Sequence, residues 1–107
     1  MDPRRRLRGL PTDVYRAYDS DGRLLYVGMS VNVFQRLKQH RYEAPWYSQV
    51  SSVRVEQYKD WRTARHVEGY AIKHEHPQWN VMSTWHNGST PEPIEVFEID
   101  ASEFGAW

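Results

Sequence analysis

The feature that most constrains how this chain can fold is the turn signal Asp19-Ser20-Asp21-Gly22. It lies between two short runs, residues 14–18 and 24–28, that are rich in β-branched and aromatic side chains. Asp and Ser side chains bond to their own backbone in turns, and Gly tolerates a positive φ. Two strand-like runs joined by such a signal predict a β-hairpin.

The register of this hairpin depends on the length of the turn. If residues 19–22 form the whole connection, Tyr18 lies opposite Arg23, and Tyr15 lies directly across from Tyr26. Cross-strand neighbours share one face of a sheet, so the two phenols would project side by side. A slip of one residue would break this arrangement.

Two helices are predicted after the hairpin. Ser30 is suited to cap the first, which runs to about Arg41 with an apolar stripe of Val33, Phe34 and Leu37. Asp60 is suited to cap the second, which ends before Pro77. The inward positions of the second helix are Trp61, Ala64, Ala71 and Ile72, and Glu68 falls within that stripe.

The remaining pattern completes an α+β fold. Alternation at Val53, Val55 and Gln57 predicts a third strand, and residues 94–99 alternate in the same way. We expect a small central three-stranded antiparallel sheet flanked by helices. The expected organisation is a basic N-terminal arm at 1–11, one domain at 12–82 and an acidic C-terminal extension at 83–107 that could add a strand.

Composition narrows the class of protein. A length of 107 residues fits one domain with a real core. The absence of cysteine excludes disulfide frameworks and thiolate metal sites. No apolar run approaches the roughly 18 residues needed to span a bilayer, and no apolar segment follows the first arginines. The sequence therefore favours a soluble, unsecreted, cytoplasmic protein without a membrane partner.

The net charge is zero, but the charges are unevenly distributed. All 14 Lys and Arg lie between Arg4 and Lys73, against nine acids up to Glu75, which leaves +5 on residues 1–75. Residues 76–107 carry five acids and no Lys or Arg. Such asymmetry indicates a polyanion-binding face. An ordinary mixed surface with an acidic end explains it equally well.

Three polar residues stand beside or within the helical stripes. Arg36 and His40 are four residues apart and share a flank of the first helix. Glu68 is a carboxylate where an apolar side chain is expected, which is costly unless it is paired or binds a metal. Taken singly, these residues and the two tyrosines also fit core packing, a solvated helix flank, or a salt bridge from Glu68 to Arg65 or His66.

Taken in order, the residues resemble the GIY-YIG nuclease superfamily. Its two strand motifs stand here as Asp13-Val14-Tyr15 and Tyr26-Val27-Gly28. The family pattern continues with an Arg, often a His one turn later, a Glu on a later helix and an Asn beyond it, matched by Arg36, His40, Glu68 and Asn80. Asp13 replaces the family glycine, and Met29 stands where some members have Lys.

The resemblance implies a divalent-metal-dependent DNA endonuclease. Arg36 would bind the phosphate, since its guanidinium offers a planar fork of donors. Tyr15 would orient or deprotonate the water with help from His40, and Tyr26 would complete the hydrogen-bond network. Glu68 would hold Mg²⁺ or Mn²⁺, which prefer oxygen ligands. The remaining member of the motif, Asn80, would hold Glu68 or the substrate backbone.

The predicted DNA contacts are made with phosphates and carry little sequence information. They involve the arginines Arg4, Arg5, Arg6, Arg8, Arg41, Arg62 and Arg65. Trp46 and Tyr47 could stack on a base, although core packing is the more common fate of such residues. The chain has no room for a separate DNA-reading domain, so a protein partner could supply specificity.

Three other readings stay open. The same fold could be a catalytically silent nucleic-acid-binding module. It could instead dock a protein through residues 94–99 by adding a strand to a sheet. A transition-metal site built from His74, Glu75, His76 and His86 is disfavoured, because positions 74 and 76 do not share a helix face.

Overall fold

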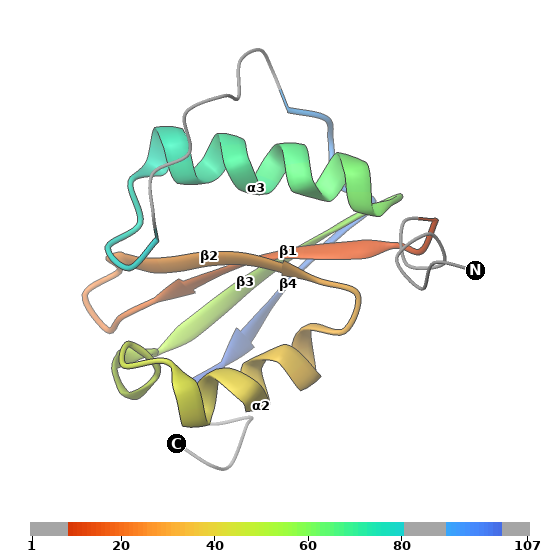
Figure 1. The fold of residues 1–107 in the computed structure, drawn as a ribbon. Coiled ribbons are helices and arrows are strands. Elements are labelled where there is room, and N and C mark those ends of the chain that lie inside the picture. The colour runs from red at the N-terminus through yellow and green to blue at the C-terminus, as the bar shows by residue number, and fades with distance from the viewer. Residues whose placement is uncertain (1–8, 81–89, 102–107) are drawn as a thin grey trace.

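The computed structural model describes residues 9–80 and 90–101 and contains a four-stranded sheet between two helices (Figure 1). In chain order the elements are β1 (Thr12–Tyr18), β2 (Leu24–Ser30), α2 (Val33–Glu43), the 3₁₀ turn η1 (Tyr47–Gln49), β3 (Ser52–Tyr58), α3 (Trp61–Glu75) and β4 (Glu95–Asp100). The predicted hairpin, third strand, two helices and later strand are all present.

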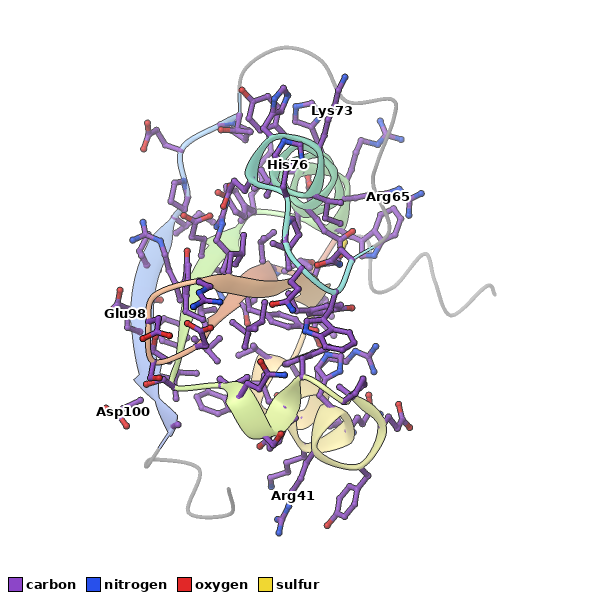
Figure 2. The ribbon with its side chains drawn as sticks, turned by 90° about the vertical axis from the view of Figure 1, so that its left-hand side faces the viewer. Arg41, Arg65, Lys73, His76, Glu98 and Asp100 are labelled. Atoms are coloured by element: carbon purple, nitrogen blue, oxygen red, sulfur yellow. The ribbon has the colours of Figure 1, made fainter. Side chains whose placement is uncertain are left out.

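The sheet is antiparallel throughout, in the order β2-β1-β3-β4. Helix α3 covers one face and α2 the other (Figure 1). The α+β prediction is confirmed, but the sheet has four strands, not three, because β4 pairs along β3. Strand β4 therefore lies at the edge opposite β2, where it contributes Glu98 and Asp100 (Figure 2).

The turn between β1 and β2 is organised by Asp19. Its carboxylate accepts hydrogen bonds from the backbone N–H groups of Asp21 and Arg23, both at 2.9 Å. Its backbone carbonyl accepts from Gly22, which has a φ of 81° that favours glycine. Asp19 N–H in turn donates to the Arg23 carbonyl, so the connection includes Arg23. The four-residue turn predicted from the sequence is one residue too short.

The predicted hairpin register is wrong, and a β-bulge is the reason. Tyr18 pairs with Leu24, but its neighbour Ala17 pairs with Tyr26, so Leu25 is an extra residue on β2. Tyr15 consequently lies opposite Gly28, two positions from the predicted partner. Without the bulge, the Tyr18–Leu24 register would pair Tyr26 with Arg16, and the Tyr26 side chain would point to the face of the sheet opposite to that of Tyr15.

The helix starts are set by side-chain caps. The Asp60 side chain accepts from Thr63 N–H at 2.8 Å and begins α3 as predicted. For α2 the cap is Asn32, which accepts from Gln35 N–H at 3.2 Å, and the prediction of Ser30 is wrong. Ser30 is the last residue of β2, and its hydroxyl bonds to the Asn32 backbone instead.

Each helix packs its apolar face against one side of the sheet. On the α2 side, Val33 and Leu37 are buried, but Phe34 is 51% exposed and does not belong to the stripe as predicted. On the α3 side, Ala64 and Ala71 are buried as predicted, with Val67 between them. The predicted inward residues Trp61 and Ile72 are only half-buried.

An ion-pair network ties the end of α3 to the sheet. Arg16 on β1 donates to both carboxylate oxygens of Glu75 at 2.9 Å and to Glu56 on β3 at 2.6 Å. Tyr58 also donates to Glu56, at 3.0 Å. The Arg16 guanidinium keeps the pKa of Glu56 below its usual range despite burial of the carboxylate. These bonds fix α3, and with it Glu68, against the sheet.

Candidate active site

The centre of the candidate site is a hydrogen bond between Tyr15 on β1 and His40 on α2. The phenol oxygen and His40 Nε2 are 2.7 Å apart, and both side chains are buried. Burial, with the nearby Arg36 cation, lowers the pKa of His40 to about 4. The imidazole is therefore neutral at pH 7, and when its proton is on Nδ1 the Tyr15 O–H donates to Nε2. Burial raises the pKa of Tyr15 and lowers that of His40, so in the free protein the proton between them stays on the phenol.

Tyr26 joins this pair because of the bulge in β2. Its ring centroid lies 6.1 Å from that of Tyr15 and 5.1 Å from that of His40, with an edge-on geometry to the imidazole. The sequence prediction that the two phenols share one face is thus correct, although its register was not. Tyr26 is only half-buried, which leaves part of its surface open to a ligand.

Arg36 supplies the positive charge of the site. It lies one helical turn before His40 on α2 and is half-buried. Burial raises the pKa of Tyr15 and of Tyr26, and the Arg36 guanidinium opposes this shift at both phenols. One of its nitrogens donates to Gln39 at 2.9 Å. An arginine this close to two phenols is well placed to receive an anion.

Glu68 brings negative charge to the same place from α3. Strand β2 is an edge of the sheet, so a side chain from α3 can approach the α2-side phenols around that edge. Its charge contributes to the raised pKa of Tyr15 and of Tyr26. Burial raises the pKa of Glu68 itself, and only Arg65 counters the shift. The helix thus completes a group of five side chains from four elements: Tyr15, Tyr26, Arg36, His40 and Glu68.

Glu68 also fits a hard divalent cation. Within residues 9–80 and 90–101, no hydrogen bond or ion pair holds its half-buried carboxylate. The same part of the chain contains no group of three or more His, Cys, Asp or Glu that could hold a metal. Mg²⁺ is commonly bound by one or two carboxylates, with water and substrate phosphate completing its shell. The half-buried carboxylate of Glu68, whose charge also acts on the two phenols, is compatible with such a site.

Asn80 lies in the segment after α3, and its contacts differ from the expectation for it. Its side-chain oxygen accepts from Val27 N–H at 2.7 Å, and its nitrogen donates to Val27 C=O at 2.9 Å. In the two residues that precede Asn80, the backbone N–H groups of Gln78 and Trp79 donate to the carbonyls of Leu24 and Leu25 on β2. Asn80 therefore clamps the strand that carries Tyr26. Among the described residues, its side chain makes these bonds and none to Glu68.

The predicted DNA-binding arginines fall into separate regions. Arg41 is exposed on the last turn of α2, with its guanidinium 5.5 Å from the Tyr42 ring centre. Arg62 and Arg65 are exposed on α3, and Arg65 lies 5.2 Å from the ring centre of Trp61. Figure 2 shows Arg41 and Arg65 projecting away from the core. The other four, Arg4, Arg5, Arg6 and Arg8, lie outside the described residues.

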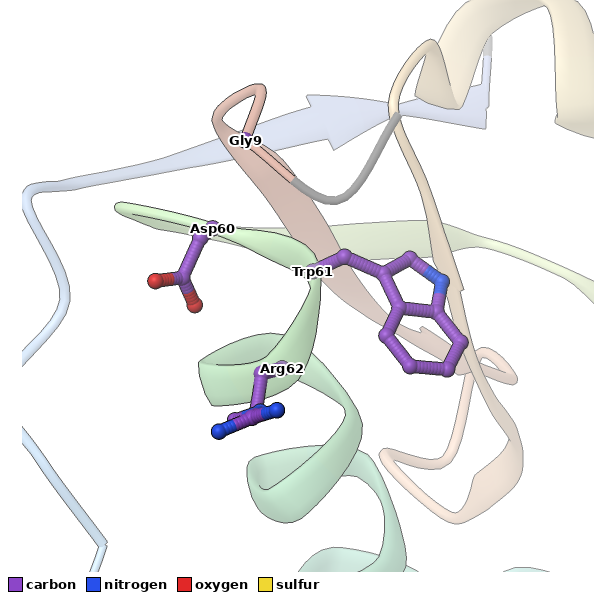
Figure 3. A pocket seen from close by; sticks show the side chains of 4 residues that line it. All are labelled: Gly9, Asp60, Trp61 and Arg62. Atoms are coloured by element: carbon purple, nitrogen blue, oxygen red, sulfur yellow. The ribbon is translucent and has the colours of Figure 1, made fainter. Parts of the chain in front are cut away.

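A cavity away from the Tyr15–His40 pair lies at the start of α3. It has a volume of about 480 Å³ and is lined by Gly9, Asp60, Trp61 and Arg62 (Figure 3). The indole of Trp61 forms one wall, and Arg62 is the next residue in the first turn of the helix. Aromatic and basic side chains together suit contact with a nucleic-acid strand.

The residues of the disfavoured transition-metal reading have other roles. Glu75 is paired with Arg16, and His76 ends α3 in a left-handed conformation with φ of 53°. His74 is exposed, and its ring contacts that of Tyr70. The fourth residue, His86, lies outside the described part of the chain.

Trp46 packs against the site, a role that the sequence did not indicate. Trp46 and Tyr47 are only 3% and 6% exposed, which fits core packing, the commoner fate expected for them, and not stacking on a base. The Trp46 indole instead stacks on Tyr26 and touches His40. The sequence signal that could have indicated this contact is the position of Trp46 in the short loop directly after the helix that carries His40.

Comparison with known proteins agrees with the geometry. A family model described as "GIY-YIG catalytic domain" matches residues 13–82, the span that contains every side chain of the candidate site. Among curated proteins and among solved structures, no significant match to the chain is found. No helix in the described part of the chain is both long and apolar enough to cross a membrane.

Proposed function

The chain belongs to the GIY-YIG family of nucleases, and from this premise we propose that it is a divalent-metal-dependent DNA endonuclease with little intrinsic sequence preference. Membership makes it a phosphodiesterase acting on nucleic acid, and the family generally uses a divalent metal. The observation that carries the finer proposal is the Tyr15–His40 hydrogen bond, which lies next to Arg36 and Glu68. These four groups supply the charge and the proton acceptor that phosphodiester hydrolysis requires.

In the proposed reaction Arg36 binds the non-bridging oxygens of the scissile phosphate. Its guanidinium donates in a fixed plane and stabilises the negative charge that grows on those oxygens in the transition state. The influence of its charge on both phenols supports a phosphate position beside the Tyr15 hydroxyl. A divalent cation held by Glu68 would add positive charge near the leaving oxygen.

Tyr15 and His40 handle the proton of the attacking water. As the water oxygen bonds to phosphorus and the P–O bond on the opposite side breaks, Tyr15 accepts the water proton and passes its own to His40 Nε2. An isolated phenol is a poor base, so the imidazole is the effective acceptor. In the free protein, burial and the Arg36 charge lower the pKa of His40. A phosphate paired with Arg36 offsets that charge, so His40 becomes a stronger base when substrate is bound.

The proposed DNA contacts involve the exposed arginines on α2 and α3. Arg41, Arg62 and Arg65 offer phosphate contacts, which fix a strand in place without reading its bases. The acidic strand β4 lies at the sheet edge opposite β2, which favours approach of a polyanion from the β2 side. Both features support binding with little sequence preference.

The decisive experiment is nicking of supercoiled plasmid in Mg²⁺, Mn²⁺ or EDTA, with Glu68→Gln beside wild type. We expect metal-dependent nicking by wild type and its loss in the variant, which keeps the shape of the side chain but not its charge. Glu43→Gln is the matched control, because Glu43 is an exposed carboxylate at the end of α2. DNA binding without nicking in any metal would instead identify a silent binding module.

A further inference from the structure

Trp46 forms a wall of the site without reaching its surface. Its ring lies 4.7 Å from that of Tyr26 with an interplanar angle of 15°, a stacked geometry. Its centroid is also 4.7 Å from that of His40, at an angle of 54°. The side chain is 3% exposed. Two rings, one from strand β2 and one from helix α2, thus meet at one almost fully buried indole.

The backbone after α2 is folded to deliver this side chain. The helix ends when Ala44 N–H donates to His40 C=O at 2.8 Å and Ala44 adopts an extended conformation. Pro45 cannot donate a helical hydrogen bond, so the chain turns there. The 3₁₀ turn then begins, with Gln49 N–H donating to Trp46 C=O at 3.0 Å. This sharp reversal returns the indole to the helix that the chain has just left.

We propose that Trp46 is a positioning residue of the nuclease, whose indole holds the Tyr26 and His40 rings in the orientation that the Tyr15–His40 hydrogen bond and the bound phosphate require. This inference rests on the proposed function. Tyr26 is stacked on Trp46 and lies edge-on to His40, so each ring limits the room in which its neighbour can rotate. Removing the indole frees both side chains to adopt other rotamers.

The chemistry explains why orientation matters here. His40 Nε2 must stay 2.7 Å from the Tyr15 oxygen to accept its proton, and imidazole rotation of a few tens of degrees breaks that contact. Small displacements of a catalytic group cost about 100-fold in rate. The indole also excludes water from His40, which is faced by Tyr15 from β1, Tyr26 from β2 and Arg36 from α2.

The test compares Trp46→Leu and Trp46→Phe with wild type. Leu fills much of the space without an aromatic face, so kcat for nicking is expected to fall about 100-fold. KM should not change, because Trp46 does not contact DNA. Phe retains a ring to stack on Tyr26 and should recover most of the rate. Tyr47→Leu is the control for a purely structural loss, since Tyr47 is similarly buried in the same turn and packs 6.4 Å from Trp46.

A second readout does not need activity. The ¹⁵N NMR signals of the His40 ring, followed with pH in metal-free and DNA-free protein, report its tautomer and pKa. In Trp46→Leu we expect loss of the single tautomer and a pKa that rises toward the ordinary value, while Tyr47→Leu stays like wild type. If wild type shows no nicking at all, the proposed function fails and this NMR comparison still decides the role of Trp46.

Specific outcomes would overturn the inference. A rise in KM at constant kcat in Trp46→Leu would mean that Trp46 contacts substrate. Equal losses of rate in Trp46→Leu and Tyr47→Leu, in step with their losses of stability, would mean that the indole only fills the core. An unchanged His40 titration in Trp46→Leu would contradict the positioning role directly.

Discussion

The phenol of Tyr15 lies flat over Gly28, its cross-strand partner on β2. A Cβ atom at position 28 would overlap the Tyr15 hydroxyl oxygen and Cζ, and would lie 2.9 Å from Cε2. Real Cβ atoms do not approach other atoms so closely. The φ of Gly28 is not in the left-handed region, so the need for glycine here is steric, not conformational. The absence of a side chain at Gly28, in the second strand motif, leaves room for the phenol of Tyr15, in the first.

Gly28→Ala should therefore displace Tyr15 and damage both stability and activity. Overpacking of a core costs about 1–3 kcal/mol, and Tyr15 is fully buried. We expect a lower urea midpoint at an unchanged m-value, and nicking reduced by about 100-fold because the phenol moves away from His40. Urea unfolding and plasmid nicking on the same preparation measure both effects.

Two further variants isolate the cause of this loss. Gly9→Ala is the matched control, because no atom of residues 9–80 or 90–101 lies within 4 Å of a Cβ there. In a Tyr15→Ala background the ring is gone, so Gly28→Ala should cost little additional stability. A full penalty in that background would show that something other than the Tyr15 ring requires glycine.

The limits of sequence reasoning are clearest at the hairpin. The turn signal and the two apolar runs correctly predicted two paired strands, because both are local properties. The extra residue Leu25 could not be seen, since Leu25 and Tyr26 are both bulky and apolar and leave no break in the pattern. Likewise Ser30 and Asn32 are both good caps, and only the extension of β2 to Ser30 decides between them.

The candidate site shows a similar division. The resemblance to the family, carried by the two motifs and by the order of Arg36, His40 and Glu68, predicted which side chains gather around Tyr15. The role of Trp46 was not predictable, because a loop has no periodicity and its packing depends on contacts distant in sequence. Asn80 was predicted to hold Glu68 or the substrate, whereas its bonds to the Val27 backbone are a property of the folded chain that the sequence does not show.

Asn80 offers a test of how firmly β2 must be held. Asn80→Ala leaves the Val27 N–H and C=O without their side-chain partners, and a buried unpaired polar group costs about 1–3 kcal/mol. Asn80→Asp should not rescue it, because a carboxylate can accept from the N–H but cannot donate to the carbonyl. Thermal unfolding of both variants measures the effect.

The control for the Asn80 clamp is Gln78→Ala. Gln78 bonds to β2 through its backbone, and its side chain is exposed, so this substitution should be neutral. We also expect Asn80→Ala to lower kcat, because Val27 adjoins Tyr26 on the strand. Stability close to wild type in Asn80→Asp would mean that the donated bond to the carbonyl contributes nothing.

The exposed arginines predict a specific salt dependence of DNA binding. If Arg41 and Arg62 each contact a phosphate, Arg41→Gln and Arg62→Gln should each reduce the slope of log K against log salt by roughly 1. The loss in affinity should be the same for unrelated duplexes, because phosphate contacts carry no sequence information. Titrations of labelled duplexes in EDTA at several salt concentrations measure the slope without cleavage.

Strand β4 provides the control for these titrations. Glu98 is exposed on the sheet edge opposite β2 (Figure 2), so Glu98→Gln changes the net charge without removing a phosphate contact. It should leave the slope unchanged. A slope that follows net charge in all three variants would show that the arginines act at long range and not by direct contact.

The lowered pKa of His40 makes stability depend on pH in a defined window. The unfolded chain takes up a proton near the ordinary value of 6.5, whereas folded His40 does so only near 4. Between these values the unfolded state binds more protons, so the free energy of unfolding falls as the pH is lowered, by at most about 1.4 kcal/mol per pH unit. His40→Gln cannot take up this proton, so its stability should change less across the window. Urea unfolding from pH 4 to pH 7 measures this, with His74→Gln, at an exposed position, as control. Parallel pH profiles for wild type and His40→Gln would mean that burial and Arg36 do not lower the pKa of His40 in solution.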